Sequence, residues 1–297
     1  MKALGYILLI CIAFITMNCE DVVEVDLPPE EPKLVIDALI RLNLEEQGSP
    51  VRIKATITGA FFDEITPTPL TRMQLTNEAI TTTAGVVFLT QDPDSPNEYI
   101  PGTDEGGPDP SGLVPNSFFT EGRLILTFEF EEELYLAETR FAPAPAIDSV
   151  IQGDQTLFDE DDIEIIVTFT DIPEQENFYV FDFDFNEFLT IEDRFFQDQQ
   201  FDFSYFYDLN LQAGDMPNIS ILGADESFYN YMDLLIEQSD LTDNGPFQVP
   251  VTTVRGNILK AEGVDNINIF DNVGRPQEFV LGYFAVSQEF KTSITIE

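Results

Sequence analysis

The sequence FDFDFN at residues 181–186 and the sequence FDFSYFYD at residues 201–208 decide the fold class. In both stretches an aromatic residue stands at every second position, and largely polar residues stand between them. A side-chain period of two is the period of a β-strand. We expect a hairpin through residues 192–200, with the aromatic rows in a core and an acidic face opposite. A stacking platform for sugars or peptides is the alternative for these aromatics, but this alternation is what a half-buried strand shows.

Short segments with β-type alternation recur along the rest of the chain. They lie at residues 34–36, 51–57, 73–75, 86–89, 124–130 and 133–139 in the first half, and at 161–170, 248–254, 266–270, 279–286 and 292–296 in the second. Connections rich in Pro and Gly separate them, notably residues 66–69 and 92–112. The pattern predicts a mostly β chain made of antiparallel β-sandwich-like domains.

A domain boundary is expected at residues 141–146, FAPAPA, because alternating Pro favours an extended backbone and removes ladder donors. The predicted β-rich domains are therefore residues 32–142 and 146–297. Only one segment has a helical period. After a cap at Asp225, four apolar residues recur at i, i+3, i+4 and i+7, which predicts a short helix near residues 226–239 of the second domain. They are Phe228, Tyr231, Met232 and Leu235.

Charge and composition exclude several classes of function. The 297 residues include 13 Lys and Arg against 55 Asp and Glu, which gives a formal net charge of −42. Such a charge repels phosphate backbones, so nucleic acid is excluded as a partner. The chain has no His, which removes the usual general base and the commonest metal ligand. Most hydrolase and zinc mechanisms are excluded with it.

The N-terminus has the features of an export signal. Lys2 precedes an uncharged run over residues 3–18, which is shorter than the ~20 residues of a membrane-spanning helix. We therefore predict a signal peptide over residues 1–18. Cys19 follows this run and precedes an acidic stretch, an arrangement that resembles a lipoprotein attachment site. We expect an acyl group on Cys19, with an uncleaved anchor as the alternative.

Residues 19–31 should then form a lipid-anchored acidic tether of roughly 40 Å, at ~3.3 Å per residue. Thr16 and Asn18 are larger than the small residues of a strict lipoprotein attachment site. Cys11 is the only other Cys and lies inside the signal, so we expect no disulfide framework.

Two groups of acidic residues are weak candidates for Ca²⁺ ligands, because Ca²⁺ prefers carboxylate and carbonyl oxygens. One group is Asp92, Asp94 and Glu98, and the other is Asp182, Asp184 and Asp202. Residues 159–162 with Glu164 offer similar oxygens, but none of these segments has the spacing of an EF-hand. A solvated acidic surface is the default interpretation, and no cofactor is expected. A glycosidase would need only two carboxylates, but without a distinctive motif we expect no enzyme.

Several short motifs occur in an order that resembles one family of lipoproteins. They are Cys19-Glu20-Asp21, Lys33-Leu34-Val35-Ile36-Asp37, Phe61-Phe62, residues 66–69, Tyr135-Leu136-Ala137-Glu138-Thr139, Ile147-Asp148-Ser149-Val150, Phe178-Tyr179, Phe228-Tyr229-Asn230-Tyr231, Asn244-Gly245-Pro246-Phe247, Arg255-Gly256-Asn257-Ile258 and Leu281-Gly282-Tyr283-Phe284. In this order the chain resembles the Bacteroidota lipoprotein family known only as domain of unknown function 4249. The chain departs from the family at residues 259–263, where a Gly-rich turn is usual, and at residues 122–124, which lack a common Tyr.

The resemblance implies an immunoglobulin-like first domain, a β-rich second domain and an outer-membrane location facing the cell exterior. It also implies a TonB-dependent transporter as partner, and it assigns no catalytic or binding residues. We therefore expect a non-enzymatic cell-surface lipoprotein that acts as a binding or accessory subunit of an uptake system. The alternative is a structural or adhesive surface protein, organised by Ca²⁺.

Overall fold

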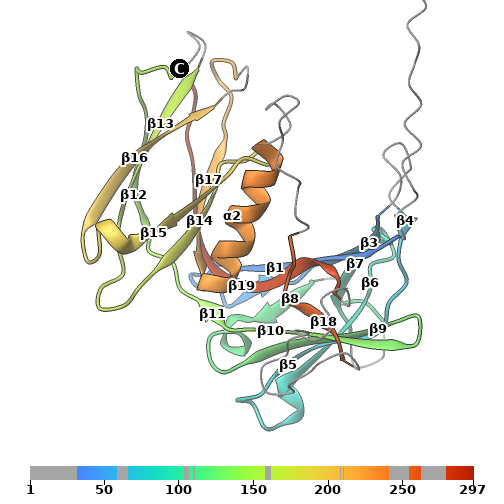
Figure 1. Cartoon of the computed structure of the whole chain (residues 1–297). Coiled ribbons are helices and arrows are strands. Elements are labelled where there is room, and N and C mark those ends of the chain that lie inside the picture. Colours follow the sequence, from blue (N-terminus) through green and yellow to red (C-terminus); the bar gives the residue numbers. More distant parts are fainter. Residues whose placement is uncertain are drawn as a thin grey trace, which may run out of the picture. The chain divides into compact units, whose positions relative to one another are not determined.

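The computed structural model describes residues 32–58, 66–103, 107–109, 111–157, 162–207, 209, 211–240, 254–261 and 279–297 (Figure 1). The expected signal peptide, Cys19 and the tether lie outside the described residues. So do the expected strand at 266–270, most of the expected strand at 248–254, the motifs at 61–62 and 244–247, and the acidic residues 159–161. From Pro32 to Glu297 the chain forms one compact unit.

The described chain is mostly β, as predicted. The strands are β1 (Leu34–Leu42), β2 (Gly48–Pro50), β3 (Ile53–Ile57), β4 (Thr66–Pro67), β5 (Thr71–Asn77), β6 (Val86–Gln91), β7 (Glu98–Pro101), β8 (Leu113–Pro115), β9 (Leu124–Phe130), β10 (Glu133–Thr139), β11 (Phe141–Ala142), β12 (Ile147–Gln152), β13 (Ile163–Thr170), β14 (Phe178–Asp182), β15 (Phe188–Glu192), β16 (Gln200–Tyr207), β17 (Asn218–Ala224), β18 (Ile258–Lys260) and β19 (Leu281–Ser293). Short 3-10 turns lie at η1 (Thr83–Gly85), η2 (Asn116–Phe118) and η3 (Asp193–Phe195). Within the described ranges the only α-helix is α2 (Glu226–Asp240), where the sequence predicts one.

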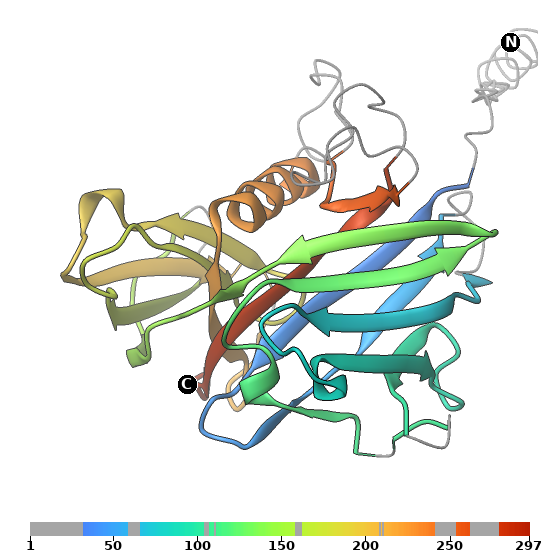
Figure 2. The same cartoon turned by 90° about the horizontal axis from the view of Figure 1, so that it is seen from below.

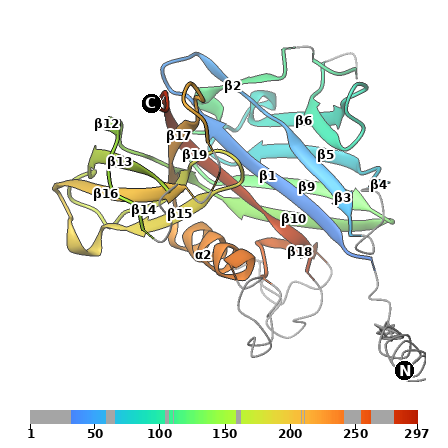
Figure 3. The same ribbon diagram turned by 90° about the horizontal axis from the view of Figure 1, so that it is seen from above.

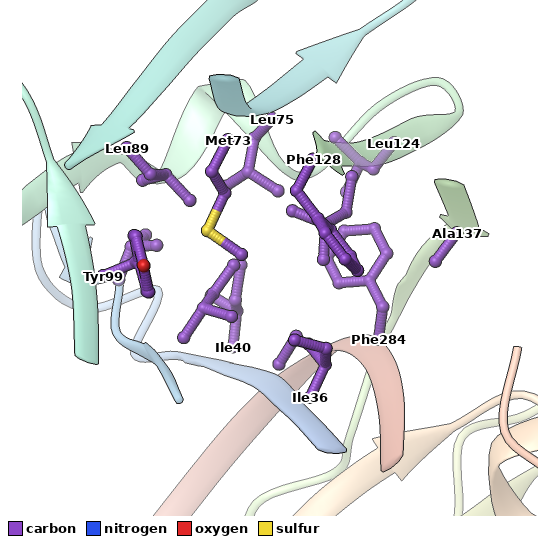
Figure 4. Packing of buried hydrophobic residues seen from close by; sticks show 14 of the residues in the cluster. Ile36, Ile40, Met73, Leu75, Leu89, Tyr99, Leu124, Phe128, Ala137 and Phe284 are labelled. Atoms are coloured by element: carbon purple, nitrogen blue, oxygen red, sulfur yellow. The ribbon is translucent and has the colours of Figure 1, made fainter. Parts of the chain in front are cut away.

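A first core lies inside the curved run of strands β19-β1-β3-β7-β6-β5-β9-β10-β18. Alternate residues of β1 and β9 point into it, because a strand turns every second side chain to the same face. Ile36, Ile40, Met73, Phe128 and Phe284 meet there (Figure 4). These residues come from four strands that are far apart in the sequence, so the core holds the two ends of the described chain together.

The sheet is mixed, which corrects the expectation of purely antiparallel domains. β1 and β19 run parallel, from Val35 beside Leu281 to Leu42 beside Gln288, and β11 also runs parallel to β19. A parallel pair needs a long crossover connection and leaves no local turn signal. The sequence pattern therefore could not show it.

Strand β19 contributes to more than one layer (Figure 2). Its first part pairs with β1 and places Phe284 in the first core. Residues 289–293 pair with β17, and Phe290 packs against a second core. The first core thus includes residues from 258–286 as well as from 34–137, and the domain boundary at residues 141–146 stays a prediction.

The second core lies between strands β12-β13-β16 and strands β15-β14-β17 with the end of β19. Its aromatic rings pack closely: Phe183 stacks on Tyr205 with centroids 3.8 Å apart, and Phe181 meets Phe203 edge-on at 5.0 Å. The two aromatic rows of the sequence therefore face each other across this core. Core packing is thus the role of these rows, except for Phe185, which lies beyond the end of β14 and is 49% exposed.

The hairpin expected through residues 192–200 is wrong. β15 pairs with β14, whereas β16 pairs with β13 in the other sheet, so the segment between β15 and β16 crosses from one sheet to the other. A hairpin and a crossing between sheets look alike in sequence, because each joins two alternating segments through a polar turn.

Helix α2 covers the outer face of strands β14, β17 and β19 (Figure 3). Phe228 and Met232 are buried there with Val180, Leu222 and Tyr283, and we name this group the helix-side cluster. Asp225 caps the helix as predicted, since its Oδ1 accepts the Phe228 N–H at 2.7 Å. Leu235 was expected on the buried face but is 41% exposed. It lies a turn beyond Met232, where β14, β17 and β19 supply no further buried partner in this cluster.

Candidate binding site at the start of helix α2

Three of the motifs that carry the family resemblance meet around one pocket, together with the start of helix α2. The motifs are residues 135–139 on β10, 255–258 at the start of β18, and 281–284 on β19, and residues 225 and 227 come from the start of α2. The pocket has a volume of about 310 Å³. Its lining residues are Glu138, Thr139, Arg140, Asp225, Ser227, Asn257 and Tyr283, and we name it the polar pocket.

Asn257 fixes one wall of the polar pocket. Its Nδ2 donates to the carbonyls of Glu138 and Phe284 at 3.0 and 2.8 Å, and its Oδ1 accepts the Phe284 N–H at 2.8 Å. The Asn257 side chain therefore hydrogen-bonds to the backbone of both β10 and β19, as a strand between them would. An amide is the side chain that offers this donor and acceptor pair.

Two glycines allow the close approach of backbone behind Asn257. Gly282 has a φ of +93°, and a Cβ at Gly256 would lie 1.6 Å from the Gly282 carbonyl oxygen. A side chain at Gly282 would also meet the Ile36 carbonyl at 1.9 Å. Only glycine fits at both positions.

Tyr283 supplies a hydroxyl between the polar pocket and the helix-side cluster. Its ring lies 5.2 Å from Phe228 and 4.8 Å from Tyr231, measured between centroids. Burial, and secondly the charge of Asp225, raises the pKa of Tyr283 above its usual value. The hydroxyl is therefore protonated at neutral pH and can donate a hydrogen bond.

The charges of the polar pocket are partly compensated by the protein itself. Glu138 pairs with Arg123 at 3.2 Å, and Asp225 caps α2. Arg140 is exposed and forms no ion pair within 4 Å with a carboxylate of the described residues. The pocket thus combines a guanidinium, carboxylates, hydroxyls and an amide, which suits it to hold a small polar molecule by hydrogen bonds.

The first expected Ca²⁺ group is held by an arginine. Arg52 lies 2.8 Å from Asp92 and 2.7 Å from Glu98, and Asp94 donates its N–H to Asp92. The N–H of Asp94, and secondly the Arg52 guanidinium, lowers the pKa of Asp92. The cation between Asp92 and Glu98 is therefore the Arg52 guanidinium.

In the second expected Ca²⁺ group, the Asp184 N–H donates to Asp182 Oδ1 at 2.9 Å, whereas Asp202 lies in a different sheet. Asp182 pairs with Arg41 at 2.7 Å, and Asp184 accepts hydrogen bonds from the N–H and side chain of Asn218 at 3.1 and 3.0 Å. Asp202 lies exposed on β16, opposite Thr168. Among the described residues, no three His, Cys, Asp or Glu side chains are placed to hold a metal ion together.

Two further acidic residues of the sequence analysis have local roles. Glu164 is buried and accepts from the Ser204 hydroxyl and the Gln155 N–H, and the Ser204 bond is the main reason that its pKa is lowered. Asp162 accepts the Leu157 N–H at 3.0 Å. Both hold the connection between β12 and β13.

A buried polar network at one end of the second core has no signal in the sequence. Asn177 donates to Asp171 and Asp193, and Tyr179 donates to Asp171. All four residues are buried. Their segments read as ordinary turns, and only the tertiary fold shows that they meet.

Comparison with known proteins places the chain in a family. No helix of the described ranges is both long enough and apolar enough to span a membrane. No curated protein is similar enough to the chain to be matched with it. The family model called "Domain of unknown function (DUF4249)" matches residues 20–293, and the chain therefore belongs to this family.

Proposed function

We propose that the chain is a non-enzymatic lipoprotein on the outer face of the outer membrane, where it serves a TonB-dependent uptake system as a binding or accessory subunit. The N-terminal sequence supports the anchor, since an apolar run ends at Cys19 and Glu20 and Asp21 follow. The lack of His supports a role without catalysis, because the usual general base at neutral pH is missing from the whole sequence.

The observation that carries the binding role is the polar pocket. Three motifs from distant parts of the chain and the start of α2 build it, and Asn257 and the glycine pair Gly256 and Gly282 fix its wall. Arg140 contributes a cation whose charge no described carboxylate within 4 Å compensates. Such a pocket fits a small polar molecule that is delivered to a transporter.

The test begins with the native protein, extracted in detergent after crosslinking on intact cells and examined by mass spectrometry. We expect an acyl mass on Cys19, a co-purified transporter and a small polar molecule retained by the complex. A Cys19→Ser variant should lose the acyl mass and leave the membrane fraction. An unmodified Cys19 in the wild type would contradict the anchor, and an acylated protein without a transporter would contradict the accessory role.

Two variants connect the retained molecule to the polar pocket. Arg140→Ala should lower its amount at least fivefold, because the pocket then lacks its cation. Arg72→Ala is the matched control, since Arg72 lies on β5, is 79% exposed and is not part of the pocket lining. Equal amounts in both variants would place the binding elsewhere.

A further inference from the structure

Two cations meet one aromatic ring where β1 and β19 begin. The Lys33 Nζ lies 5.2 Å and the Arg255 Cζ lies 4.8 Å from the centroid of the Phe279 ring, both within the ~6 Å of a cation–π contact. Phe279 and Lys33 are partly buried, and Arg255 is exposed. We name these three residues the cationic patch. Two like charges beside one ring repel each other, so an anion bound between them would be stabilised by both.

Many of the cations in the described ranges are neutralised by the chain's own acids. Lys33 and Arg255 form no ion pair within 4 Å with a described carboxylate. Asp37 is the nearest carboxylate along β1, and in the sheet it lies beside Lys54 of β3. The cations that do have a carboxylate within 4 Å are Arg41, Arg52, Arg72, Arg123, Arg194 and Lys260. Among the described residues, the charge around Phe279 is therefore positive, in a chain whose net charge is −42.

The backbone of the cationic patch is held in place by the sheets. The Lys33 N–H donates to the Thr58 hydroxyl at 2.8 Å, and the Lys33 carbonyl accepts the Thr58 N–H at 2.9 Å. Phe279 forms an antiparallel bridge with Leu259. Arg255 comes directly before the segment that the amide of the polar pocket joins to β10 and β19. An anion would therefore meet groups whose backbone is already ordered, which lowers the entropy cost of binding.

The cationic patch lies close in sequence to the expected lipid anchor. Lys33 is the second described residue of the body and lies 14 residues after Cys19. An extended chain of this length spans at most roughly 50 Å. With a lipid on Cys19, Lys33 is never farther than this from the surface of the membrane. The phosphate groups of that membrane are therefore within reach of the patch.

The net charge of the chain determines what such a patch does. A charge of −42 repels an anionic membrane surface, so the body as a whole is not attracted to it. Lys and Arg side chains are attracted to anionic head groups, and this attraction acts only within about a Debye length. A local group of cations on an acidic body thus selects the side of the body that turns towards the membrane.

We propose that the cationic patch binds phosphate head groups of the membrane that holds the lipid anchor, and that it fixes which side of the body faces this membrane. The inference rests on the proposed function for the anchor on Cys19. It adds a second contact with the membrane, at residues that do not line the polar pocket.

The test uses the natively acylated full chain, transferred from detergent into vesicles of phosphatidylcholine with or without the anionic lipid phosphatidylglycerol. Acetic anhydride, which is uncharged, acetylates lysines, and mass spectrometry measures the rate at each one. We expect Lys33 to react about fivefold more slowly in the anionic vesicles than in the neutral ones. Lys291 is the internal control, because it is exposed on the part of β19 that pairs with β17, and it should react at the same rate in both.

Two variants connect this protection to the cationic patch. Arg255→Gln should bring the Lys33 rate in anionic vesicles close to the rate in neutral vesicles, because the patch then lacks one of its two cations. Arg72→Gln is the matched control and should keep the protection, since Arg72 lies on β5 and is 79% exposed. Both variants should keep the wild-type melting temperature, because both guanidinium groups are exposed.

The outcomes separate this inference from the proposed function. If the chain floats with the vesicles but Lys33 reacts equally fast in both kinds, the patch is overturned and the anchor stands. Equal slowing of Lys33 and Lys291 would also overturn it, since the contact would not depend on the patch. Equally strong protection by inorganic phosphate without vesicles would assign the site to a free anion instead. A wild-type chain that does not float with vesicles would contradict the anchor, and both proposals would fail together.

Discussion

Asp193 is a carboxyl whose surroundings disfavour its charged form. It is 1% exposed, and Asn177 offers it only neutral donors. Burial, together with the charges of Asp171 and Glu176, raises the pKa of Asp193 above its usual 3.8, although the Asn177 bonds act in the opposite direction. Because the folded-state pKa is the higher one, protonation stabilises the fold. This stabilisation is complete below the unfolded pKa and is lost as the pH rises through the folded pKa.

Asp193→Asn should therefore raise the melting temperature at pH 7. The amide is uncharged at every pH, whereas the carboxyl is uncharged only when it is protonated. We expect a rise of about 2–4 °C, which corresponds to roughly 1 kcal/mol in a chain of this size. The difference from the wild type should shrink as the pH falls towards 4. Thermal scans between pH 4 and pH 8 measure it.

The control for this variant is Asp202→Asn on the exposed edge of β16, which should change the melting temperature little. A lower melting temperature of Asp193→Asn at pH 7 would contradict the prediction. It would show that Asn177 holds the carboxylate better than it holds an amide.

At the scale of elements, Arg41 joins strands that belong to different cores. It lies 2.7 Å from Asp182 on β14 and 3.3 Å from Glu289 on β19, and Ser220 on β17 donates to the same Glu289 oxygen at 2.7 Å. Arg41→Leu would leave two partly buried carboxylates without their cation. We expect the free energy of unfolding to fall by about 1–3 kcal/mol, as for other poorly solvated groups that lose a partner.

Arg72→Leu is the matched control for Arg41→Leu in urea denaturation. Arg72 pairs with Glu129 at the same distance, 2.7 Å, but its side chain is 79% exposed, whereas that of Arg41 is 31% exposed. An exposed pair contributes less than about 1 kcal/mol. Equal losses in the two variants would mean that burial does not strengthen the Arg41 contacts.

The elements that local pattern determines were predicted well. The alternating segments at 124–130 and 133–139 coincide with β9 and β10, and the apolar period after Asp225 marks α2. The parallel pair β1–β19 and the crossing after β15 were not predicted, because strand partners far apart in sequence leave no local signal. Pairing is decided by tertiary packing, which alternation alone does not specify.

The candidate site was predictable only in part, for the same reason. Glu138, Asn257 and Tyr283 belong to motifs that were noted in the sequence, but nothing there shows that they meet. The acidic pair Asp92 and Glu98 looked like cation ligands because their partner, Arg52, lies about forty residues away in the sequence. A sequence rich in carboxylates does not reveal which of them are paired with an arginine in the fold.

At the scale of the whole molecule, the net charge of −42 is the dominant property. Repulsion among so many carboxylates opposes the compact state, and salt weakens it over a Debye length of about 10 Å at 0.1 M. Added NaCl should therefore raise the melting temperature. This general effect of ions must be separated from a specific effect of Ca²⁺, on which the structural or adhesive alternative depends.

Thermal scans of the detergent-extracted full chain with Ca²⁺ or with Mg²⁺ at matched ionic strength separate the two effects. Because Asp92, Glu98 and Asp182 are already paired with arginines, we expect both ions to raise the melting temperature equally. A specific site at one hundred times its Kd would instead add about 2.7 kcal/mol of stability with Ca²⁺ alone. In a chain of this length that is a rise of roughly 5–10 °C, which a thermal scan resolves easily. A rise of that size with Ca²⁺ but not with Mg²⁺ would favour the adhesive role, and it would place the ion on carboxylates other than these three.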